Sequence, residues 1–79
     1  MSTTQWFRIR SSQDFARTLS EARIARHMTQ REVATTTGID RTYLSRMENG
    51  LDSIQLERAL HVLRILGVQI EARMEIVDE

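Results

Sequence analysis

The segment Gln30–Asn49, QREVATTTGIDRTYLSRMEN, constrains the fold of this chain more than any other part of its sequence. It places Ala34, Gly38 and Leu44 at its fifth, ninth and fifteenth positions. A small residue fits where two crossed helices touch, glycine adopts the left-handed backbone that ends the first helix, and leucine fills the wedge between the helices. The spacing therefore predicts two short helices joined by a tight turn.

Capping residues mark the limits of the first of these helices. Thr29 and Glu32 are three residues apart, the spacing of a capping box, in which side chain and backbone satisfy each other's hydrogen bonds. The first helix should therefore begin at Gln30 and end near Thr36, ahead of Gly38.

The second helix is marked in the same way. Asp40 can cap its first turn, and Asn49 with Gly50 can end it, which places the helix at residues 41–48. Two short helices at this spacing are typical of a helix-turn-helix that reads DNA, in which the second helix enters the major groove.

One more helix is expected on each side of this pair. Ser11 or Ser12 can cap the earlier helix, which should run through about His27, and Asp52 or Ser53 can open the later one, which should reach about Leu66 before Gly67 ends it. Helical spacing predicts their core-facing residues, which are Phe15, Leu19, Ala22 and Met28 in the earlier helix and Leu56, Ala59, Leu60, Leu63 and Leu66 in the later one. Ile24 lies off this stripe and should be exposed, either as an incidental apolar residue or as part of a surface for a partner.

The last segment follows a different period. Residues 68–76 alternate between apolar and polar side chains, which predicts a half-buried strand whose apolar members are Val68, Ile70, Ala72, Met74 and Ile76. Residues 6–10 alternate as well and indicate a short strand or an extended arm. An isolated strand leaves its backbone groups unpaired, so the last strand needs either residues 6–10 or the same strand of a second copy. The second alternative leads to a two-fold dimer.

Length and composition indicate a single small, soluble domain without disulfides. Residues 1–79 make a single small domain, divided into an arm or strand at 1–11, a helical part at 12–67 and a strand at 68–77. The absence of cysteine excludes disulfides and thiolate metal sites and favours a reducing cytoplasm. No long apolar run, signal peptide or lipidation motif occurs, so we expect a soluble protein with no membrane partner.

The net charge is zero, but it is unevenly distributed. Residues 1–50 carry eight arginines against five acidic residues, a balance of +3, whereas residues 51–79 carry three arginines against six acidic residues, a balance of −3. The basic half contains the helix pair. Because phosphate contacts need a positive field, this asymmetry favours a nucleic-acid partner despite the overall neutrality.

The sequence argues against an enzyme. His27 and His61 stand on separate predicted helices without ligand partners at metal spacing, and no Gly-rich phosphate loop occurs. We therefore predict no catalytic residue, no metal site and no cofactor. The strongest rival from another class is a protein-interaction module that does not bind DNA, because small helical domains also serve as adaptors.

Three stretches resemble one family. They are Met28-Thr-Gln-Arg-Glu-Val-Ala, Gly38-Ile-Asp-Arg-Thr-Tyr-Leu-Ser-Arg-Met-Glu-Asn-Gly and Leu66-Gly-Val, and over residues 13–68 they resemble the Xre/Cro family of phage-repressor-type DNA-binding domains. The extended arm, the fourth helix and the terminal strand more particularly resemble HipB-like antitoxins. The resemblance implies a lambda-repressor-like bundle of about four helices whose C-terminal strand pairs across a homodimer. This chain stops at Glu79, without the long C-terminal tail of the best-known members.

The resemblance, together with helix position and charge, assigns roles to residues. If the helix at 41–48 enters the major groove, its outward residues reach base edges. The expected base contacts are Arg41, Thr42, Ser45 and Arg46, and the expected backbone contacts are Gln30, Asp40, Tyr43, Asn49, Arg31 and Arg26. Arg23 and Glu48 match a family pair that bridges the first and third helices, so we expect them to be structural, along with Ala34, Gly38 and Leu44.

Together these features predict a cytoplasmic, nucleoid-associated repressor that binds palindromic double-stranded DNA as a homodimer. By resemblance it would be the antitoxin of a toxin–antitoxin pair, with a HipA-like kinase as its toxin partner. A stand-alone Xre-family transcriptional regulator is the alternative.

Overall fold

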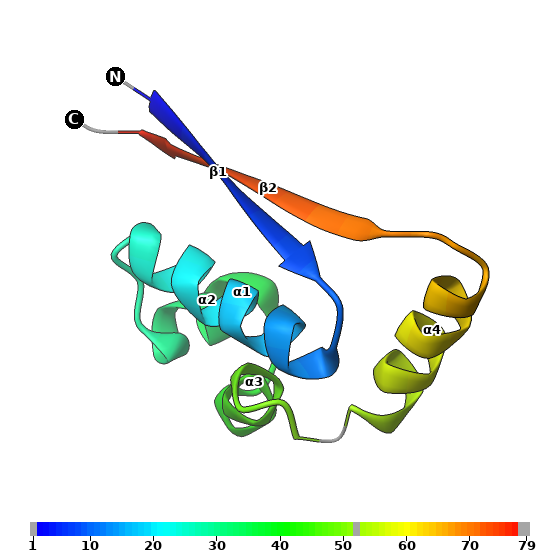
Figure 1. The fold of residues 1–79 in the computed structure, drawn as a ribbon. Coiled ribbons are helices and arrows are strands. Elements are labelled where there is room, and N and C mark those ends of the chain that lie inside the picture. The colour runs from blue at the N-terminus through cyan, green and yellow to red at the C-terminus, as the bar shows by residue number, and fades with distance from the viewer. Residues whose placement is uncertain (1, 52, 78–79) are drawn as a thin grey trace.

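The computed structural model describes residues 2–51 and 53–77 as four helices and one two-stranded sheet (Figure 1). In chain order these are β1 (Ser2–Ile9), α1 (Ser12–Ala25), α2 (Gln30–Thr37), α3 (Arg41–Glu48), α4 (Ile54–Ile65) and β2 (Ile70–Val77). The predicted class, a mostly helical domain with a C-terminal strand, is confirmed. Both ends of the predicted 1–79 domain and the expected cap at Asp52 lie outside the described residues.

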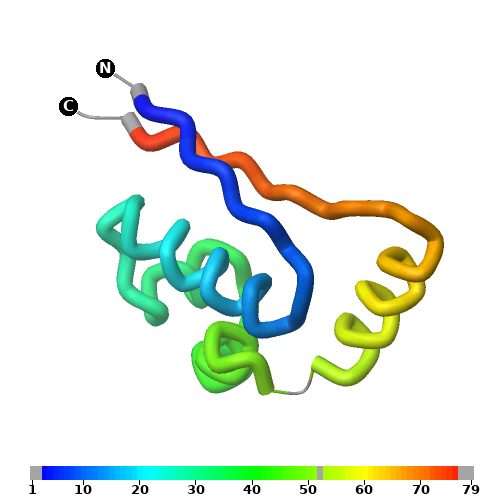
Figure 2. Tube along the Cα trace, viewed as in Figure 1, coloured from blue at the N-terminus to red at the C-terminus, as the bar shows by residue number. Residues whose placement is uncertain are grey.

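β1 and β2 come from opposite ends of the chain and run antiparallel side by side (Figure 2). The register places Ser2 opposite Val77 and Ile9 opposite Ile70. β2 therefore satisfies one edge of its backbone within its own chain, which is the first of the two predicted alternatives, and pairing across a dimer is not required for that purpose. β2 begins at Ile70, so Val68 precedes the strand.

The two faces of the sheet differ in chemistry. Phe7 and Ile9 lie opposite Ala72 and Ile70 on the face that packs on α1, and Ile9 is buried. On the other face the guanidinium of Arg73 lies 5.8 Å from the centre of the Trp6 ring, a cation–π distance. The sheet thus covers α1 with apolar side chains and turns polar and aromatic ones to solvent.

Three helices end with the same hydrogen-bond pattern around a left-handed residue. In α3 and α4 that residue is glycine, Gly50 and Gly67, as their sequence position suggests. In α1 it is His27, with φ 57°, whose N–H bonds to the carbonyl of Ile24 while the N–H of Met28 bonds to that of Arg23. Because His27 takes the conformation that usually needs glycine, α1 ends at Ala25, two residues before the predicted end near His27.

The core is small, with four buried apolar residues among those described, namely Ile9, Ala16, Leu44 and Leu60. The prediction that Phe15 faces the core is wrong, because α1 turns Ser12 and Ala16 inward and leaves Phe15 38% exposed. Ile24 is exposed as predicted.

The predicted inner face of α4 is partly wrong. Leu60 is buried and Leu56 and Leu63 are half-buried, but Ala59 is exposed and Leu66 is 69% exposed. The reason is the position of α4, which lies to one side of α1, α2 and α3 (Figure 1). Its first turn also lacks the predicted side-chain cap, since the Ser53 hydroxyl donates to the carbonyl of Gly50 instead.

Candidate nucleic-acid interface

The capping box at the start of α2 is present in full. The Thr29 hydroxyl accepts from the N–H of Glu32 at 3.1 Å, and the Thr29 N–H donates to the Glu32 carboxylate at 3.0 Å. The backbone hydrogen bond from Thr29 lowers the pKa of Glu32, so the carboxylate stays charged where the helix dipole favours a negative group. This box fixes the end of α2 that is expected to face a phosphate.

The turn between α2 and α3 is built as the spacing of Gln30–Asn49 predicts. Gly38 has φ 76°, and its N–H closes α2 on the carbonyl of Ala34 at 2.9 Å. Asp40 then caps α3 by accepting from the N–H of Thr42 at 2.8 Å. Leu44 is 5% exposed and Ala34 is half-buried, which is the burial expected of residues at the contact between the two helices.

An ion pair ties the end of α3 to α1. Arg23 donates through Nε to Glu48 at 2.9 Å and through a terminal nitrogen at 3.1 Å, and its other terminal nitrogen reaches the carbonyl of Met28 at 2.8 Å. The Glu48 side chain is 5% exposed and that of Arg23 is 18% exposed. The two-pronged geometry gives the pair direction as well as charge, so it holds α3 at a set angle to α1.

Glu48 is charged although it is buried. Burial alone would raise its pKa, but hydrogen bonds from Arg23 and Gln30, together with the positive charge of Arg23, outweigh burial and hold the pKa of Glu48 below its usual value. The Gln30 amide donates to Glu48 at 3.3 Å. The sequence predicted the partner Arg23 but not Gln30, because 18 residues separate Gln30 from Glu48 and no local pattern links them.

The outer side of α3 carries the residues expected to meet bases. Arg41, Thr42 and Arg46 are exposed, whereas Ser45 is half-buried. The Tyr43 ring is 56% exposed, so it projects from the domain more than it packs. The carbonyl of Ser45 accepts from the Asn49 side chain at 2.8 Å, a contact that uses the Asn49 amide to close the helix.

A hollow of about 400 Å³ lies where α2, α3 and α1 meet. Arg23, Thr29, Gln30, Arg31 and Arg41 line it. It therefore brings the first turn of α2, the positive end of the helix dipole, beside two exposed cations, Arg31 and Arg41. This is an arrangement that suits a phosphate oxygen.

One predicted contact residue lies elsewhere. Arg26 lines a separate hollow of about 320 Å³ between α1 and the sheet, together with Phe7, Ala22 and Arg73. The structure thus brings Gln30, Arg31 and Arg41 together at one hollow but places Arg26 at another.

The described residues show neither a metal-ligand cluster nor a membrane-spanning helix. Within residues 2–51 and 53–77, no group of three or more His, Cys, Asp or Glu side chains could hold a metal ion. Over the same ranges, no helix has the length and apolar character needed to cross a bilayer.

The capped helix pair, the left-handed turn and the exposed arginine face of α3 define a helix-turn-helix DNA-binding domain. A family model described as helix-turn-helix, HTH_3, matches residues 19–72, and the chain belongs to this Xre/Cro-type family. The family consists of DNA-binding regulatory domains, so the protein is a DNA-binding transcription regulator. No curated protein and no solved structure gives a significant match to the chain.

Proposed function

We propose that the protein is a sequence-specific repressor that binds a palindromic operator as a homodimer, with α3 of each subunit in the major groove. One observation carries the proposal: Arg41, Thr42 and Arg46 are exposed on a helix that Arg23 and Glu48 hold at a fixed angle. A rigid helix with an outward cationic end suits base recognition, because a side chain can select a base only if its helix is positioned first.

The residues of this surface divide into two roles. Arginine offers two donors to O6 and N7 of guanine, and the threonine methyl can touch that of thymine, so the proposed base contacts are Arg41, Thr42, Ser45 and Arg46. The proposed backbone contacts are Gln30, Asp40, Tyr43, Asn49, Arg31 and Arg26, of which Gln30 and Arg31 line the hollow at the first turn of α2.

We further propose that this repressor is the antitoxin of a HipBA-like pair, which represses its own operon and neutralises a HipA-like kinase. The support is the resemblance to HipB-like proteins, together with a terminal strand that the helix-turn-helix itself does not need. Co-expression with the product of the adjacent reading frame tests this role. We expect the product of the adjacent reading frame to arrest growth and this chain to relieve the arrest. If that product is not toxic, the antitoxin role is wrong and the stand-alone regulator is the remaining hypothesis.

The role of Arg41 can be measured directly. Replacing it with alanine removes the proposed guanine contact, so affinity for the upstream DNA of its own gene should fall by about tenfold or more, while affinity for random duplex changes little. The matched control is Arg17→Ala, because Arg17 is an exposed arginine on α1 that pairs with Asp14 at 2.7 Å.

Fluorescence anisotropy with labelled duplexes gives both affinities for each variant. Equal losses on both duplexes would reassign Arg41 to phosphate contact. An unchanged affinity for the upstream DNA would remove it from the interface.

A further inference from the structure

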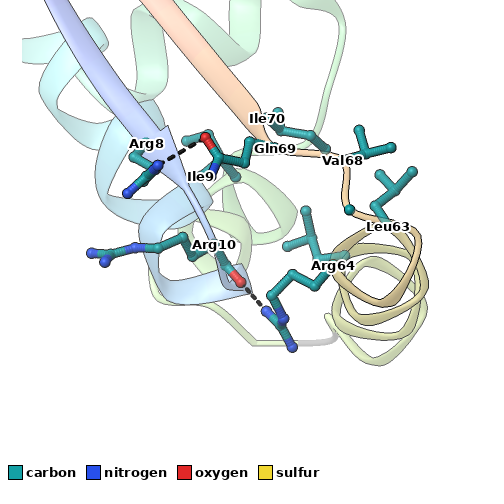
Figure 3. Close-up of a pocket in the computed structure, with 10 residues that line it drawn as sticks. Arg8, Ile9, Arg10, Leu63, Arg64, Val68, Gln69 and Ile70 are labelled. Atoms are coloured by element: carbon teal, nitrogen blue, oxygen red, sulfur yellow. Dashed lines mark hydrogen bonds between the residues drawn. The ribbon is translucent and has the colours of Figure 1, made fainter.

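A hollow of about 340 Å³ lies between the sheet and α4 (Figure 3). Its walls come from the end of β1, the second half of α4 and the segment that joins α4 to β2. Pockets that hold small molecules in proteins have volumes from about 300 Å³ upward, so this hollow is large enough for a small ligand. The residues that line it differ from those that line the hollow at the first turn of α2.

Much of the wall of this hollow is apolar. Its large apolar members are Ile9, Leu60, Leu63, Val68 and Ile70. Ile9 and Leu60 are two of the four buried apolar residues of the described chain, whereas Val68 is 45% exposed. Close packing normally leaves few spaces larger than a water molecule beside core side chains. Here half of the core borders an open space, and an apolar group that entered it would be removed from water.

The charged residues around the hollow are all cations. Arg8, Arg10 and Arg64 line it, and its described lining residues include no acidic side chain. Arg64 donates to the carbonyl of Arg10, and Arg8 donates to the Gln69 side chain at 2.8 Å (Figure 3). The Arg10 side chain turns instead toward Asp14, with 3.6 Å between Nε and the carboxylate. Since a guanidinium carries five N–H donors, Arg8 and Arg64 each keep donors for a further acceptor.

Of these two cations, Arg64 has the clearer access to a ligand. Arg8 lies opposite Glu71 in the strand register, so it has an acidic neighbour across the sheet. Glu57 is on the same helix as Arg64, but its carboxylate accepts from the N–H of Ser12 at 2.8 Å. Arg64 is exposed, and it stands at the edge of an apolar wall. The hollow therefore combines one accessible positive group with an apolar interior.

We propose that this hollow binds a small amphiphilic anion, a carboxylate head on an apolar body. The guanidinium of Arg64 holds the carboxylate, and the apolar body lies against Leu60 and Leu63. Arginine binds a carboxylate through two parallel hydrogen bonds, and burial of the apolar body adds free energy in proportion to its area. The proposal goes beyond the proposed function, because none of the lining residues is a proposed DNA contact.

The first test measures binding of octanoate, a probe of this chemical class, to the full chain by isothermal titration calorimetry. Two further probes separate the parts of the ligand: octan-1-ol keeps the apolar body but has no charge, and acetate keeps the carboxylate but has almost no apolar body. Octanoate should bind about tenfold or more tightly than either, because each of the other probes loses one of the two interactions.

Arg64→Gln tests the cation. The glutamine amide can still donate a hydrogen bond to the carbonyl of Arg10, but the positive charge is gone. Affinity for octanoate should therefore fall by about tenfold, while affinity for octan-1-ol stays as in wild type. The matched control is Arg58→Gln, because Arg58 is an exposed arginine on α4 that is not among the lining residues.

Leu63→Phe tests the apolar wall. The larger ring takes up space that the apolar body of the ligand needs, so affinity for octanoate and for octan-1-ol should both fall by about tenfold or more. Val62→Phe is the matched control, since it adds a ring at the neighbouring position of α4, where Val62 is 54% exposed and is not among the lining residues.

A measurement on wild type alone remains informative if these variants fail to fold. Octanoate added to the isotope-labelled chain should shift the amide NMR signals of Ile9, Gly67 and Gln69, which line the hollow. The amide signals of α2 and α3 should stay in place.

Several outcomes would overturn the inference. Wild type that does not bind octanoate at millimolar concentration would do so, as would equal affinities for octanoate and either of the other probes. Octanoate binding that is unchanged in Arg64→Gln, or NMR shifts confined to α2 and α3, would also contradict it. DNA affinity is measured separately on the same chain. Octanoate binding without DNA binding would therefore contradict the proposed function alone, and DNA binding without octanoate binding would contradict this inference alone.

Discussion

At the scale of single residues, the Arg23–Glu48 pair has the largest consequence. Arg23→Met keeps most of the aliphatic stem but leaves Glu48 buried without its cation, so the free energy of unfolding should fall by about 3 kcal/mol or more. That is a large part of the stability of a small domain. Urea unfolding measures the change.

The double variant Arg23→Met with Glu48→Leu is the control for this prediction. Removing both charges also removes the unpaired carboxylate, so most of the lost stability should return. A double variant no more stable than Arg23→Met would show that packing of the arginine stem, and not charge pairing, holds the two helices together.

The same carboxylate gives a pH dependence of known sign. The pKa of Glu48 lies below its ordinary value of 4.5 in the folded protein, so the ion pair stabilises the fold above that value and loses its effect as the pH falls through the folded pKa. The stability gap between wild type and Glu48→Gln should therefore be widest near pH 7 and narrow toward pH 3.

Exposed Glu21→Gln serves as the control in this experiment, because it removes a carboxylate from the same helix as Arg23 without touching the bridge. Comparison of variants is needed since Asp14, Glu32 and Glu57 also have lowered pKa values and add to the acid sensitivity of every variant. A gap for Glu48→Gln that is constant from pH 7 to pH 3 would contradict the assigned role of Glu48.

At the scale of elements, helix ends give a matched pair of substitutions. Gly38 has φ 76°, and a Cβ added there meets no atom within 4 Å, so Gly38→Ala should cost about 1 kcal/mol through backbone strain alone. His27 shows the reverse situation, since it already holds a left-handed backbone. His27→Gly should raise stability by up to about 1 kcal/mol. Thermal unfolding of the two variants should give shifts of opposite sign, and shifts of the same sign would refute this explanation.

The sequence predicts an element well when the residues that begin and end it lie next to each other in the chain. Thr29, Glu32, Gly38 and Asp40 act within four residues of their targets, and α2, the turn and α3 lie where those residues indicate. The end of α1 carries no such signal, because glycine is the usual residue at a left-handed helix end and His27 stands there instead, so α1 is about two residues shorter than expected.

The strands are harder to predict, because their pairing joins distant parts of the chain. Thr3 and Gln5 are polar, so the alternation is visible only from Trp6 onward, yet they lie opposite Ile76 and Met74 and extend β1 back to Ser2. That pairing joins residues more than 60 positions apart. The alternation of apolar and polar residues identified β2, and the need to pair its backbone left two candidate partners, residues 6–10 and the same strand of a second copy. The choice between these partners depends on tertiary structure.

The candidate site also has features that the sequence predicted and features that only the structure shows. The pairing of Arg23 with Glu48 followed from resemblance, whereas the amide of Gln30 on Glu48 and the separate position of Arg26 are products of how helices cross. The base and backbone contacts of α2 and α3 stay predictions, to be decided by binding measurements on the variants described above.

At the scale of the whole molecule, the chain is more extended than a compact domain of its length, because α4 lies apart from the other helices. The Cα radius of gyration is 13.8 Å, larger than the value of about 11.6 Å expected for a compact chain of this length. The sheet and α1, α2 and α3 form the packed part, and α4 extends to one side (Figure 1). The basic half of the chain contains the helix-turn-helix, and the acidic half contains α4 and β2.

The central claim, that this neutral chain reads DNA through a basic helix pair, is tested most directly by salt. Anisotropy titrations measure the affinity of the full chain for duplex DNA from upstream of its own gene. They are repeated at several salt concentrations from about 50 to about 200 mM, the range over which proteins that contact several phosphates lose much of their affinity. The logarithm of the binding constant should fall linearly with the logarithm of salt concentration, with a slope that reflects several phosphate contacts. An affinity independent of salt, or no binding at the lowest concentration, would contradict the account and favour a protein-interaction module.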